Sequence, residues 1–386
     1  MSWSTGLGLL ALVIWIYLLV GRAGFWLARE RDDRDRPAVL ARWPSVTAVV
    51  PARNEADVIG QSIASLLRQD YPGRFHVVLV DDGSDDGTAD RALASAANAG
   101  AERLDVVRGA ALPAGWTGKV WAQHQGIQHA ISSIGRPDYL LLTDADIGHA
   151  PDSLRSLVAH AESRGLVLAS LMAELSCRHW AERFLIPAFV FFFQMLYPFA
   201  WVADRKRRLA AAAGGCMLVR SEALERIGGI ASIKSEIIDD CALARRLKEQ
   251  GPIRLDLTRR ATSLRPYEGL PDIGRMVSRS AYAQLDYSPL LLAGTVAGMA
   301  IAYLAPAVLA LIGSGLAQAF GLGAWLLMAI SFQPMLRFYR LSPLWGLALP
   351  AIAGAYTMFT VQSAMAVWRG QGGMWKGRVQ AGMGEL

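Results

Sequence analysis

Hydrophobic positions along this chain follow two patterns. Residues 7–21, 287–336 and 341–368 carry no charged side chain. Because a helix needs about 20 apolar residues to cross a bilayer, these stretches predict one membrane span near the N-terminus, two in the second stretch and one in the third. Between them, short apolar runs alternate with segments of helical periodicity, which is typical of an α/β domain.

The α/β pattern begins with two β-branched runs, residues 46–50 and 76–80, on either side of a helical segment at 56–69. Strand, helix and strand in this order predict a right-handed crossover in a parallel sheet. A third apolar run starts at Tyr139 and ends at two carboxylates. Further strands are predicted at 166–172, after Gly215 and at 253–263, and further helices at 151–164, 221–226 and 241–250.

Polar residues follow each of the first three strands, at the edge where α/β sheets bind ligands. Residues 51–55 follow the first, 81–87 the second, and Asp144 and Asp146 the third. Side chains two apart on an extended chain share a face, so both aspartates can reach one Mg²⁺ or Mn²⁺, whose other ligands would be water and diphosphate oxygens. Chance alone also produces an Asp-x-Asp pair, and an Asp-Gly turn with a helix cap explains 81–87.

A glycine-containing loop at 112–119 ends at Lys119. Gly118 allows close backbone approach, and Lys119 would present one ammonium group to a phosphate. A solvated lysine in a turn is the alternative. Trp116 and Trp121 flank Lys119, and either stacking on a ligand or core packing explains them.

Three runs in order, VPARNE at 50–55, VDDGS at 80–84 and TDAD at 143–146, resemble the nucleotide-sugar domain of family 2 glycosyltransferases. The resemblance implies the GT-A fold, a Rossmann-like α/β domain with a mostly parallel sheet, a nucleotide-diphosphate sugar as donor, and Mg²⁺ or Mn²⁺ as cofactor. It implies contacts to the donor or metal for eight residues: Pro51 and Ala52 at the base, Glu55 and Asp82 at the nucleoside, Asp144 near the ribose and diphosphate, Asp146 on the metal, and Gly214 and Gly215 beside the donor sugar.

A second acidic cluster, Glu236, Asp239 and Asp240, precedes the helix at 241–250. Family 2 enzymes usually carry Glu-Asp here, with the aspartate as the general base that takes the acceptor proton. The resemblance therefore implies that Asp240 is the base and Asp239 stands in the place of the glutamate. Helix capping is the alternative, because an acidic residue at a helix N-terminus contributes about 0.3–1 kcal/mol.

Two further stretches, 112–121 and 375–378, are similar to membrane-bound hopanoid-associated glycosyltransferases and their ceramide-glucosyltransferase-like relatives. This similarity implies a lipid acceptor, a hopanoid first, with a ceramide or a polyprenyl phosphate as alternatives. Residues 273–285 lack the Gln-x-x-Arg-Trp motif of processive relatives, which favours transfer of a single sugar. Arg275 or Arg279 would then neutralise the leaving diphosphate.

Composition narrows the class of partner. The chain has a net charge of +6 and is 53% hydrophobic, and its arginines cluster beside the apolar stretches. Anionic headgroups are therefore the expected partner, and nucleic acid is not. Cys177, Cys216 and Cys241 are far apart and form neither a metal motif nor a disulfide framework, which fits a reducing compartment.

Charge also predicts the topology. Five arginines between 22 and 36 follow the first apolar stretch, so the positive-inside rule puts that end in the cytoplasm, in an integral inner-membrane protein. Three C-terminal spans would then leave Arg369, Lys376 and Arg378 outside, so either one span is re-entrant or the tail is an exception.

The expected domains are an anchor at 1–28, a basic linker at 29–44, a GT-A domain at 45–286, spans at 287–368 and a basic tail at 369–386. Residues 184–203 carry no charge; a crossing there would separate the acidic motifs, so an interfacial helix is predicted, with a buried helix as the alternative.

These features predict an inverting glycosyltransferase that faces the cytoplasm and glycosylates a lipid hydroxyl. Nucleotidyl transfer on a related fold and a non-catalytic membrane scaffold are the alternatives. The sequence predicts neither the sugar nor the oligomeric state.

Overall fold

The computed structural model describes residues 2–34, 39–97, 99–370, 374–375 and 378–379. The chain divides into two compact units. The helical unit comprises residues 1–29, 177–200 and 266–373, and the sheet unit comprises 30–176, 201–265 and 374–386. Residues 35–38 of the predicted linker and most of the predicted basic tail lie outside the described residues.

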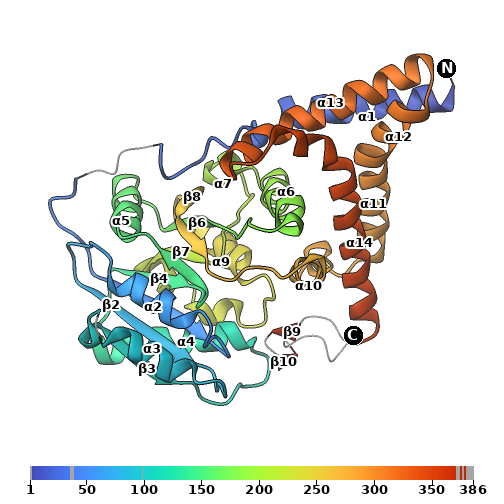
Figure 1. Ribbon diagram of the computed structural model, residues 1–386. Coiled ribbons are helices and arrows are strands. Elements are labelled where there is room, and N and C mark those ends of the chain that lie inside the picture. Colours follow the sequence, from blue (N-terminus) through green and yellow to red (C-terminus); the bar gives the residue numbers. More distant parts are fainter. Residues whose placement is uncertain (1, 35–38, 98, 371–373, 376–377, 380–386) are drawn as a thin grey trace. The chain divides into compact units, whose positions relative to one another are not determined.

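The sheet unit is built on an eight-stranded mixed sheet (Figure 1). Its strand order is β3-β2-β1-β4-β7-β6-β8-β5. The strands are β1 Val46–Ala52, β2 Phe75–Asp81, β3 Leu104–Arg108, β4 Tyr139–Thr143, β5 Ile147–His149, β6 Leu168–Glu174, β7 Cys216–Arg220 and β8 Ile253–Ser263. The α/β class expected from the sequence is confirmed.

Strand direction decides which side chains meet. β3, β2, β1 and β4 are parallel, β7 is antiparallel to β4 and to β6, and β8 is parallel to β6. Two reversals restore direction, so β6 and β8 run the same way as β4. The carboxyl ends of β1, β2, β4 and β8 therefore lie along one edge, and β7 begins at that edge, where Thr143 pairs with Cys216.

Helices of the sheet unit connect these strands: α2 Ile59–Leu67, α3 Thr88–Ala96, α4 Gly118–His129, α5 Ser153–Ser163, α7 Phe199–Ala203 at the boundary, α8 Ser221–Arg226 and α9 Asp239–Lys248. All seven residues of β1 are buried, and α4 packs against β1 and β2. A Cβ on Gly126 of α4 would lie 2.5 Å from Cγ1 of Val49. Glycine at this position thus allows the close approach of α4 to β1.

The first strand extends further than predicted, to Ala52 instead of Val50. Proline lacks an N–H and is normally excluded from central strands. Pairing of β1 with β4 ends at Val49, whereas pairing with β2 continues through Pro51 to Ala52. Pro51 is tolerated because β1 has only one neighbour at that point.

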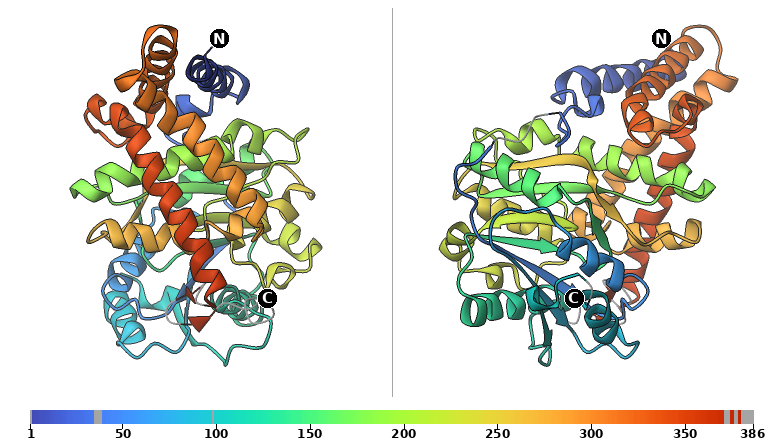
Figure 2. Two further views of the ribbon diagram at one scale, coloured as in Figure 1. Left: turned by 90° about the vertical axis from the view of Figure 1, so that its right-hand side faces the viewer. Right: turned by 60° about the vertical axis from the view of Figure 1, so that its left-hand side comes forward.

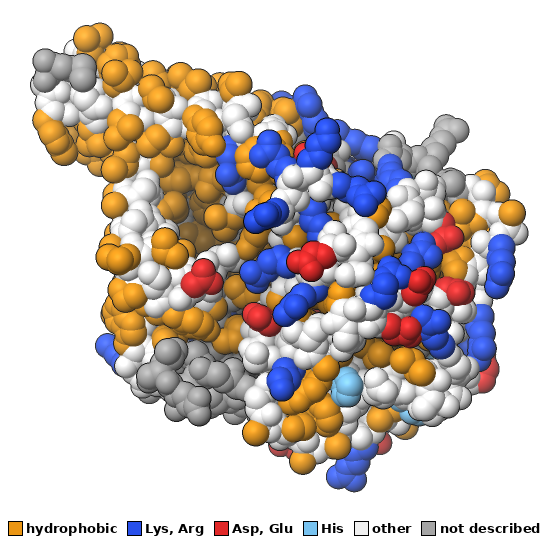
Figure 3. Space-filling view, turned by 180° about the vertical axis from the view of Figure 1, so that it is seen from behind, with side chains coloured by type: hydrophobic (Ala, Val, Ile, Leu, Met, Phe, Trp, Pro, Cys, Tyr) orange, Lys and Arg blue, Asp and Glu red, His pale blue; other side chains and the backbone are white. Residues whose placement is uncertain are grey.

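The helical unit contains four helices long and apolar enough to cross a membrane: Trp3–Gly21, Pro289–Ile312, Gly315–Phe338 and Pro343–Trp368. These contain α1 Trp3–Gly21, α11 Pro289–Met299, α12 Ala305–Ile312, α13 Gly315–Phe338 and α14 Leu349–Trp368. α1 packs along α13 (Figure 2). Hydrophobic side chains dominate the surface of these helices, and Lys and Arg are numerous on the sheet unit (Figure 3).

The uncharged segment at 184–203 forms two helices, although one was predicted. α6 Trp180–Leu196 ends before Pro198, and α7 follows it. More than half of the residues of α6 are buried, and α6 packs against α10 Leu270–Ser278, α13 and α14 within the helical unit. Glu182 starts this helix by accepting the N–H of His179 at 2.9 Å. The interfacial position predicted for 184–203 stays a prediction.

Candidate active site

Residues predicted to bind a donor gather at the edge where β1, β2, β4 and β8 end. Hydrogen bonds from backbone N–H groups join the loops after β1 and β2. The N–H of Asp82 donates to the carbonyl of Ala52 (2.8 Å), that of Asn54 to Oγ of Ser84 (3.0 Å), and that of Glu55 to Oγ1 of Thr88 (2.9 Å). Glu55 and Asp82 are thereby fixed, and both are buried. Pro51 and Ala52 lie inside the buried strand.

Lys119 links two acidic motifs that are far apart in sequence. It lies in the first turn of α4, and its Nζ is 2.8 Å from Oδ1 of Asp144 and 3.3 Å from Oδ2 of Asp239. Burial alone would lower the pKa of Lys119, but the carboxylates of Asp144 and Asp239 outweigh it and raise that pKa. Lys119 is therefore a permanent cation between the end of β4 and the head of α9.

Asp240 lies within the electrostatic influence of Lys119 and next to Gly214. The N–H of Gly214 donates to Oδ2 of Asp240 (2.9 Å), and that of Cys241 donates to Oδ1 (2.7 Å). Burial and then the charge of Asp239 raise the pKa of Asp240 to about 6, against the opposing effect of Lys119. A Cβ on Gly214 would lie 3.0 Å from Nζ of Lys119 and 3.5 Å from Oδ2 of Asp240. Glycine thus leaves room for both groups.

These five residues, the Lys119 cluster, are Lys119, Asp144, Asp239, Asp240 and Gly214. All five were predicted site residues. A carboxylate with a pKa near 6 is mostly ionised at neutral pH and can accept a proton. The cluster therefore combines a possible general base with a fixed positive charge.

A second group, the Arg265 cluster, comprises Arg265, Glu55, Asp57 and Asp146. Nη1 of Arg265 is 2.9 Å from Oδ2 of Asp57, Nη2 contacts Glu55, and Nε is 3.9 Å from Oδ2 of Asp146. Burial, then Asp144 and Glu55, raise the pKa of Asp146 to about 6, and Arg265 opposes this. The charge of Asp144 thus acts on Asp146 as well as on Lys119, and the two clusters together are called the acidic site.

Sequence reasoning missed Arg265. The available signal was its position two residues beyond the predicted end of the last strand, because β8 ends at the same edge as β1 and β4. The N–H of Leu264 donates to the carbonyl of Asp146 at 2.8 Å, which fixes Arg265 beside the Asp-x-Asp motif.

Asp144 and Asp146 suit a divalent cation. The raised pKa of Asp146 arises partly from the charges of Asp144 and Glu55, so more negative than positive charge surrounds it. The described residues contain no group of three or more His, Cys, Asp or Glu side chains placed to hold a metal. The protein would therefore supply two carboxylates, and a diphosphate and water would supply the remaining ligands, which is usual for Mg²⁺.

The other residues predicted from the sequence belong to neither the Lys119 cluster nor the Arg265 cluster. Gly215 packs on Ile147, where its Cβ would be 3.2 Å from Cδ1, and Glu236 is exposed. Trp116 and Trp121 contact each other with ring centroids 5.1 Å apart, and both contact His124. Packing thus accounts for at least one face of each indole ring.

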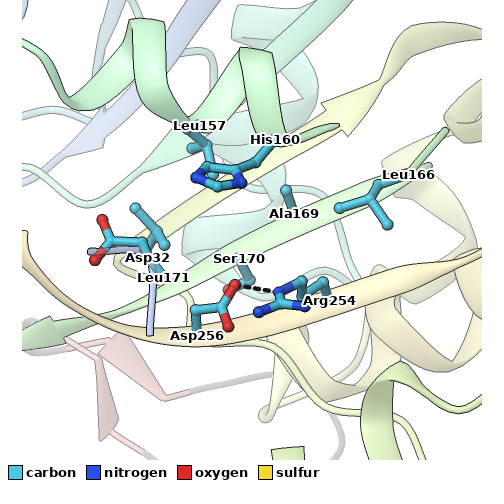
Figure 4. Close-up of a pocket in the computed structure, with 9 residues that line it drawn as sticks. All are labelled: Asp32, Leu157, His160, Leu166, Ala169, Ser170, Leu171, Arg254 and Asp256. Atoms are coloured by element: carbon cyan, nitrogen blue, oxygen red, sulfur yellow. Dashed lines mark hydrogen bonds and ion pairs between the residues drawn. The ribbon is translucent and has the colours of Figure 1, made fainter. Parts of the chain in front are cut away.

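A separate polar pocket has a structural explanation (Figure 4). None of the acidic-site residues lines it. There, Nε of Arg254 donates to Oδ2 of Asp256 (2.6 Å), and Oδ2 of Asp32 accepts from Oγ1 of Thr258 (2.7 Å). Because Arg31 also pairs with Leu257 of β8, this region fastens the segment after the first helix to the sheet. The full lining is Asp32, Leu157, His160, Leu166, Ala169, Ser170, Leu171, Arg254 and Asp256.

Known glycosyltransferases are similar to part of this chain in sequence and in fold. Residues 47–228 match the family described as Glycosyl transferase family 2. An N-acetylglucosaminyltransferase of Mesorhizobium japonicum is 31% identical over 182 residues, which are 46% of this chain and 37% of that protein. A 4,4'-diaponeurosporenoate glycosyltransferase of Staphylococcus aureus is 33% identical over 122 residues, 31% of this chain and 29% of that protein. The chain thus spans about a third of these relatives.

Among solved structures, a mannosyltransferase from Pyrobaculum calidifontis in complex with GDP-Man and Mn²⁺ superposes with a TM-score of 0.56. The match is 20% identical and covers 92% of this chain and 99% of that one. The fold is therefore the GT-A fold, and residues 47–228 match the glycosyltransferase family 2 domain.

Proposed function

We propose that the chain is an inverting glycosyltransferase that moves one sugar from a nucleotide-diphosphate sugar to the hydroxyl group of a lipid. The observation that carries this proposal is the position of Lys119, which joins Asp144 at the strand end to Asp239 at the helix head, beside Asp240. A donor-binding carboxylate and a possible base thus share one cation.

Three residues of the Lys119 cluster act at the step of sugar transfer: Asp240, Lys119 and Gly214. Asp240 takes the proton of the acceptor hydroxyl as its oxygen bonds to the anomeric carbon, on the face opposite the departing diphosphate. The bond between that carbon and the diphosphate oxygen breaks, and the electron pair leaves with the diphosphate. Lys119 stabilises the negative charge that develops there. Gly214 orients Asp240 through its N–H.

The loops after β1 and β2 hold the nucleotide. Glu55 and Asp82 contact the nucleoside, beside a base framed by Pro51 and Ala52, and Gly215 lies near the donor sugar. Asp144 and Asp146 hold Mg²⁺ or Mn²⁺, which when bound would offset charge on the diphosphate. Support comes from the solved mannosyltransferase, whose complex contains GDP-Man and Mn²⁺.

The acceptor is a lipid, and a hopanoid is the first candidate. Support comes from the four candidate spans and from a relative named as a 4,4'-diaponeurosporenoate glycosyltransferase. In this proposal the catalytic domain, residues 45–286, faces the cytoplasm, and the arginines that follow the first candidate span support that orientation.

The test uses the full chain in nanodiscs with lipid extract and a panel of labelled nucleotide sugars. Label should enter the lipid fraction, and EDTA should prevent this. Release of pyrophosphate with no lipid label would favour nucleotidyl transfer. No turnover of any donor would favour a membrane scaffold. Label in lipid despite EDTA would contradict the metal assignment and leave glycosyl transfer standing.

A further inference from the structure

Four consecutive cationic side chains follow α7 in the sheet unit: Arg205, Lys206, Arg207 and Arg208. All four are exposed. With Asp204 they form the basic turn, residues 204–208, which carries four positive charges and one negative charge. Oδ1 of Asp204 accepts the N–H of Lys206 at 2.9 Å, and the carbonyl of Asp204 accepts the N–H of Arg207 at 3.1 Å. The backbone of this segment is therefore held in one conformation.

Lys248 ties together the two ends of the basic turn. From the last turn of α9, its Nζ donates to three carbonyl oxygens, those of Trp201 (3.2 Å), Val202 (2.8 Å) and Leu209 (2.5 Å). Two of these acceptors precede the basic turn and one follows it. One ammonium group thus closes the loop at its base, so that little further ordering would be needed when a partner binds.

The four cations differ in their partners. The guanidinium carbon of Arg207 lies 4.3 Å from the centroid of the Trp201 ring, and its Nε is 3.9 Å from Asp204. Arg205, Lys206 and Arg208 make no ion pair with any residue that the structure describes. Three positive charges are therefore held together on the surface without a counter-charge from the part of the chain that the structure describes.

We propose that the basic turn binds the anionic headgroups of membrane lipids. Its chain position supports this partner, because Arg205 comes five residues after Ala200, where the chain leaves the unit that holds the four candidate spans. Arginine matches the oxygens of a phosphate, and tryptophan is enriched at membrane interfaces. Basic clusters beside membrane segments gain about fivefold in affinity for anionic lipid with each Lys or Arg. The proposal is independent of glycosyl transfer.

The first test measures protection of arginine side chains. The full chain is placed in nanodiscs of phosphatidylcholine, with or without phosphatidylglycerol, and phenylglyoxal modification is read by mass spectrometry. Phosphatidylglycerol should slow the labelling of Arg205 and Arg208 about tenfold. Arg245 and Arg246, exposed on α9 of the same unit, serve as the internal control and should not change. Salt at about 1 M should abolish the protection, because it screens charges beyond about 3 Å.

Three results would overturn the proposal. Equal labelling of Arg205 and Arg208 in both lipid compositions at low salt would show that the basic turn does not touch headgroups. Equal protection in neutral and anionic nanodiscs would mean that protein or neutral lipid covers it. Protection by soluble nucleoside diphosphate in neutral nanodiscs would make it a nucleotide site.

A second test uses variants that leave the fastened base of the loop intact. R205Q/K206Q/R208Q keeps Arg207 on Trp201 and keeps Lys248, and R245Q/R246Q removes a matched exposed pair. Lipids that co-purify with each variant from mixed nanodiscs are quantified by mass spectrometry. The triple variant should lose its enrichment of phosphatidylglycerol by at least fivefold, whereas the double variant should match the wild type. Equal enrichment in all three proteins would contradict the proposal.

Discussion

The two clusters of the acidic site neutralise their carboxylates in different ways. The side chain of Lys119 is 16% exposed and lies between Asp144 and Asp239. Asp144 directly follows β4, and Asp239 begins α9. The side chain of Arg265 is 35% exposed, and its nearest partners, Glu55 and Asp57, lie in a single loop. Both clusters join distant parts of the sheet unit, the Lys119 cluster at the head of α9 and the Arg265 cluster at the end of β8, and they differ in how far water reaches the cation.

This difference separates a fixed cation from a replaceable one. Removal of Lys119 would leave the partly buried carboxylates of Asp144 and Asp239 uncompensated, which is unfavourable. Arg265 lies 3.9 Å from Asp146, and pairs at this exposure contribute little to stability because water screens them. We therefore expect changes in the Lys119 cluster to affect turnover, and changes at Arg265 to affect cation binding.

The largest effect is expected for Asp240→Asn. The amide cannot accept the acceptor proton, so turnover should fall by about a thousandfold or more, while affinity for the donor should persist because Lys119 and Asp144 remain. Glu236→Gln alters an exposed carboxylate in the same segment and serves as the control. Rate assays and donor binding by calorimetry check this, and full activity in Asp240→Asn would move the base elsewhere.

Substitution of Lys119 should have the next largest effect. Lys119→Met leaves Asp144 and Asp239 without a counter-charge, so we expect turnover to fall about a hundredfold, a loss typical when a preorganised charge is removed, together with a lower Tm. Lys119→Arg restores the charge and should recover part of both. Lys234→Met, an exposed lysine of the same unit, should match the wild type. If Lys119→Met kept normal turnover, Lys119 would be a structural bridge only.

Local pattern predicted some elements with their observed bounds, such as the helix at 221–226, and missed others, such as β3 and β5. The strand at 253–263 was predicted with the bounds observed for β8, because the alternation of apolar Ile253, Leu255 and Leu257 with polar residues is a local signal. β5 has only three residues, Ile147–His149, and exists because it pairs with β8, so no local signal marks it. Pro198 lies between α6 and α7, and proline interrupts a helix, so this break had a local signal that the prediction did not use.

The acidic site was predicted as a set of residues, but its partition into two clusters was not. Each carboxylate stood in a motif at a strand end or helix head. The partner of each carboxylate depends on the reversal at β7 and on the direction of β8, and these arise from pairing between strands more than 70 residues apart. Arg265 was missed for this reason. It follows β8, and the edge of the sheet at which β8 ends could not be assigned from sequence alone.

Acidification should separate activity from stability. Asp240 has a pKa near 6 and must be ionised to act as a base, so kcat/KM should fall about tenfold per pH unit below about 6. An unfolded aspartate has a pKa near 3.9, so the contribution of Asp240 to stability has the opposite sign. It is fully present below pH about 4 and is lost as the pH rises through about 6.

Rate and Tm measured from pH 5 to about 8 test the predicted fall in kcat/KM below pH about 6 and the predicted loss of stability as the pH rises through about 6. Asp240→Asn should reduce the dependence of Tm on pH without abolishing it, because Asp146 also has a pKa near 6. A rate that does not change through pH 6 would contradict the assignment of Asp240 as the titrating base.

Arg265→Gln should have the smallest effect, and its sign is informative. Without the guanidinium near Asp146, more negative charge faces an incoming cation, so Mn²⁺ should bind about two- to fivefold more tightly, the range expected for a partly exposed charge pair. Titration followed by electron paramagnetic resonance measures this without turnover. Arg245→Gln removes an exposed arginine of α9 and is the matched control. Weaker Mn²⁺ binding would mean instead that Arg265 positions Asp146 and Glu55, and the Arg265 cluster would then be as fixed as the Lys119 cluster.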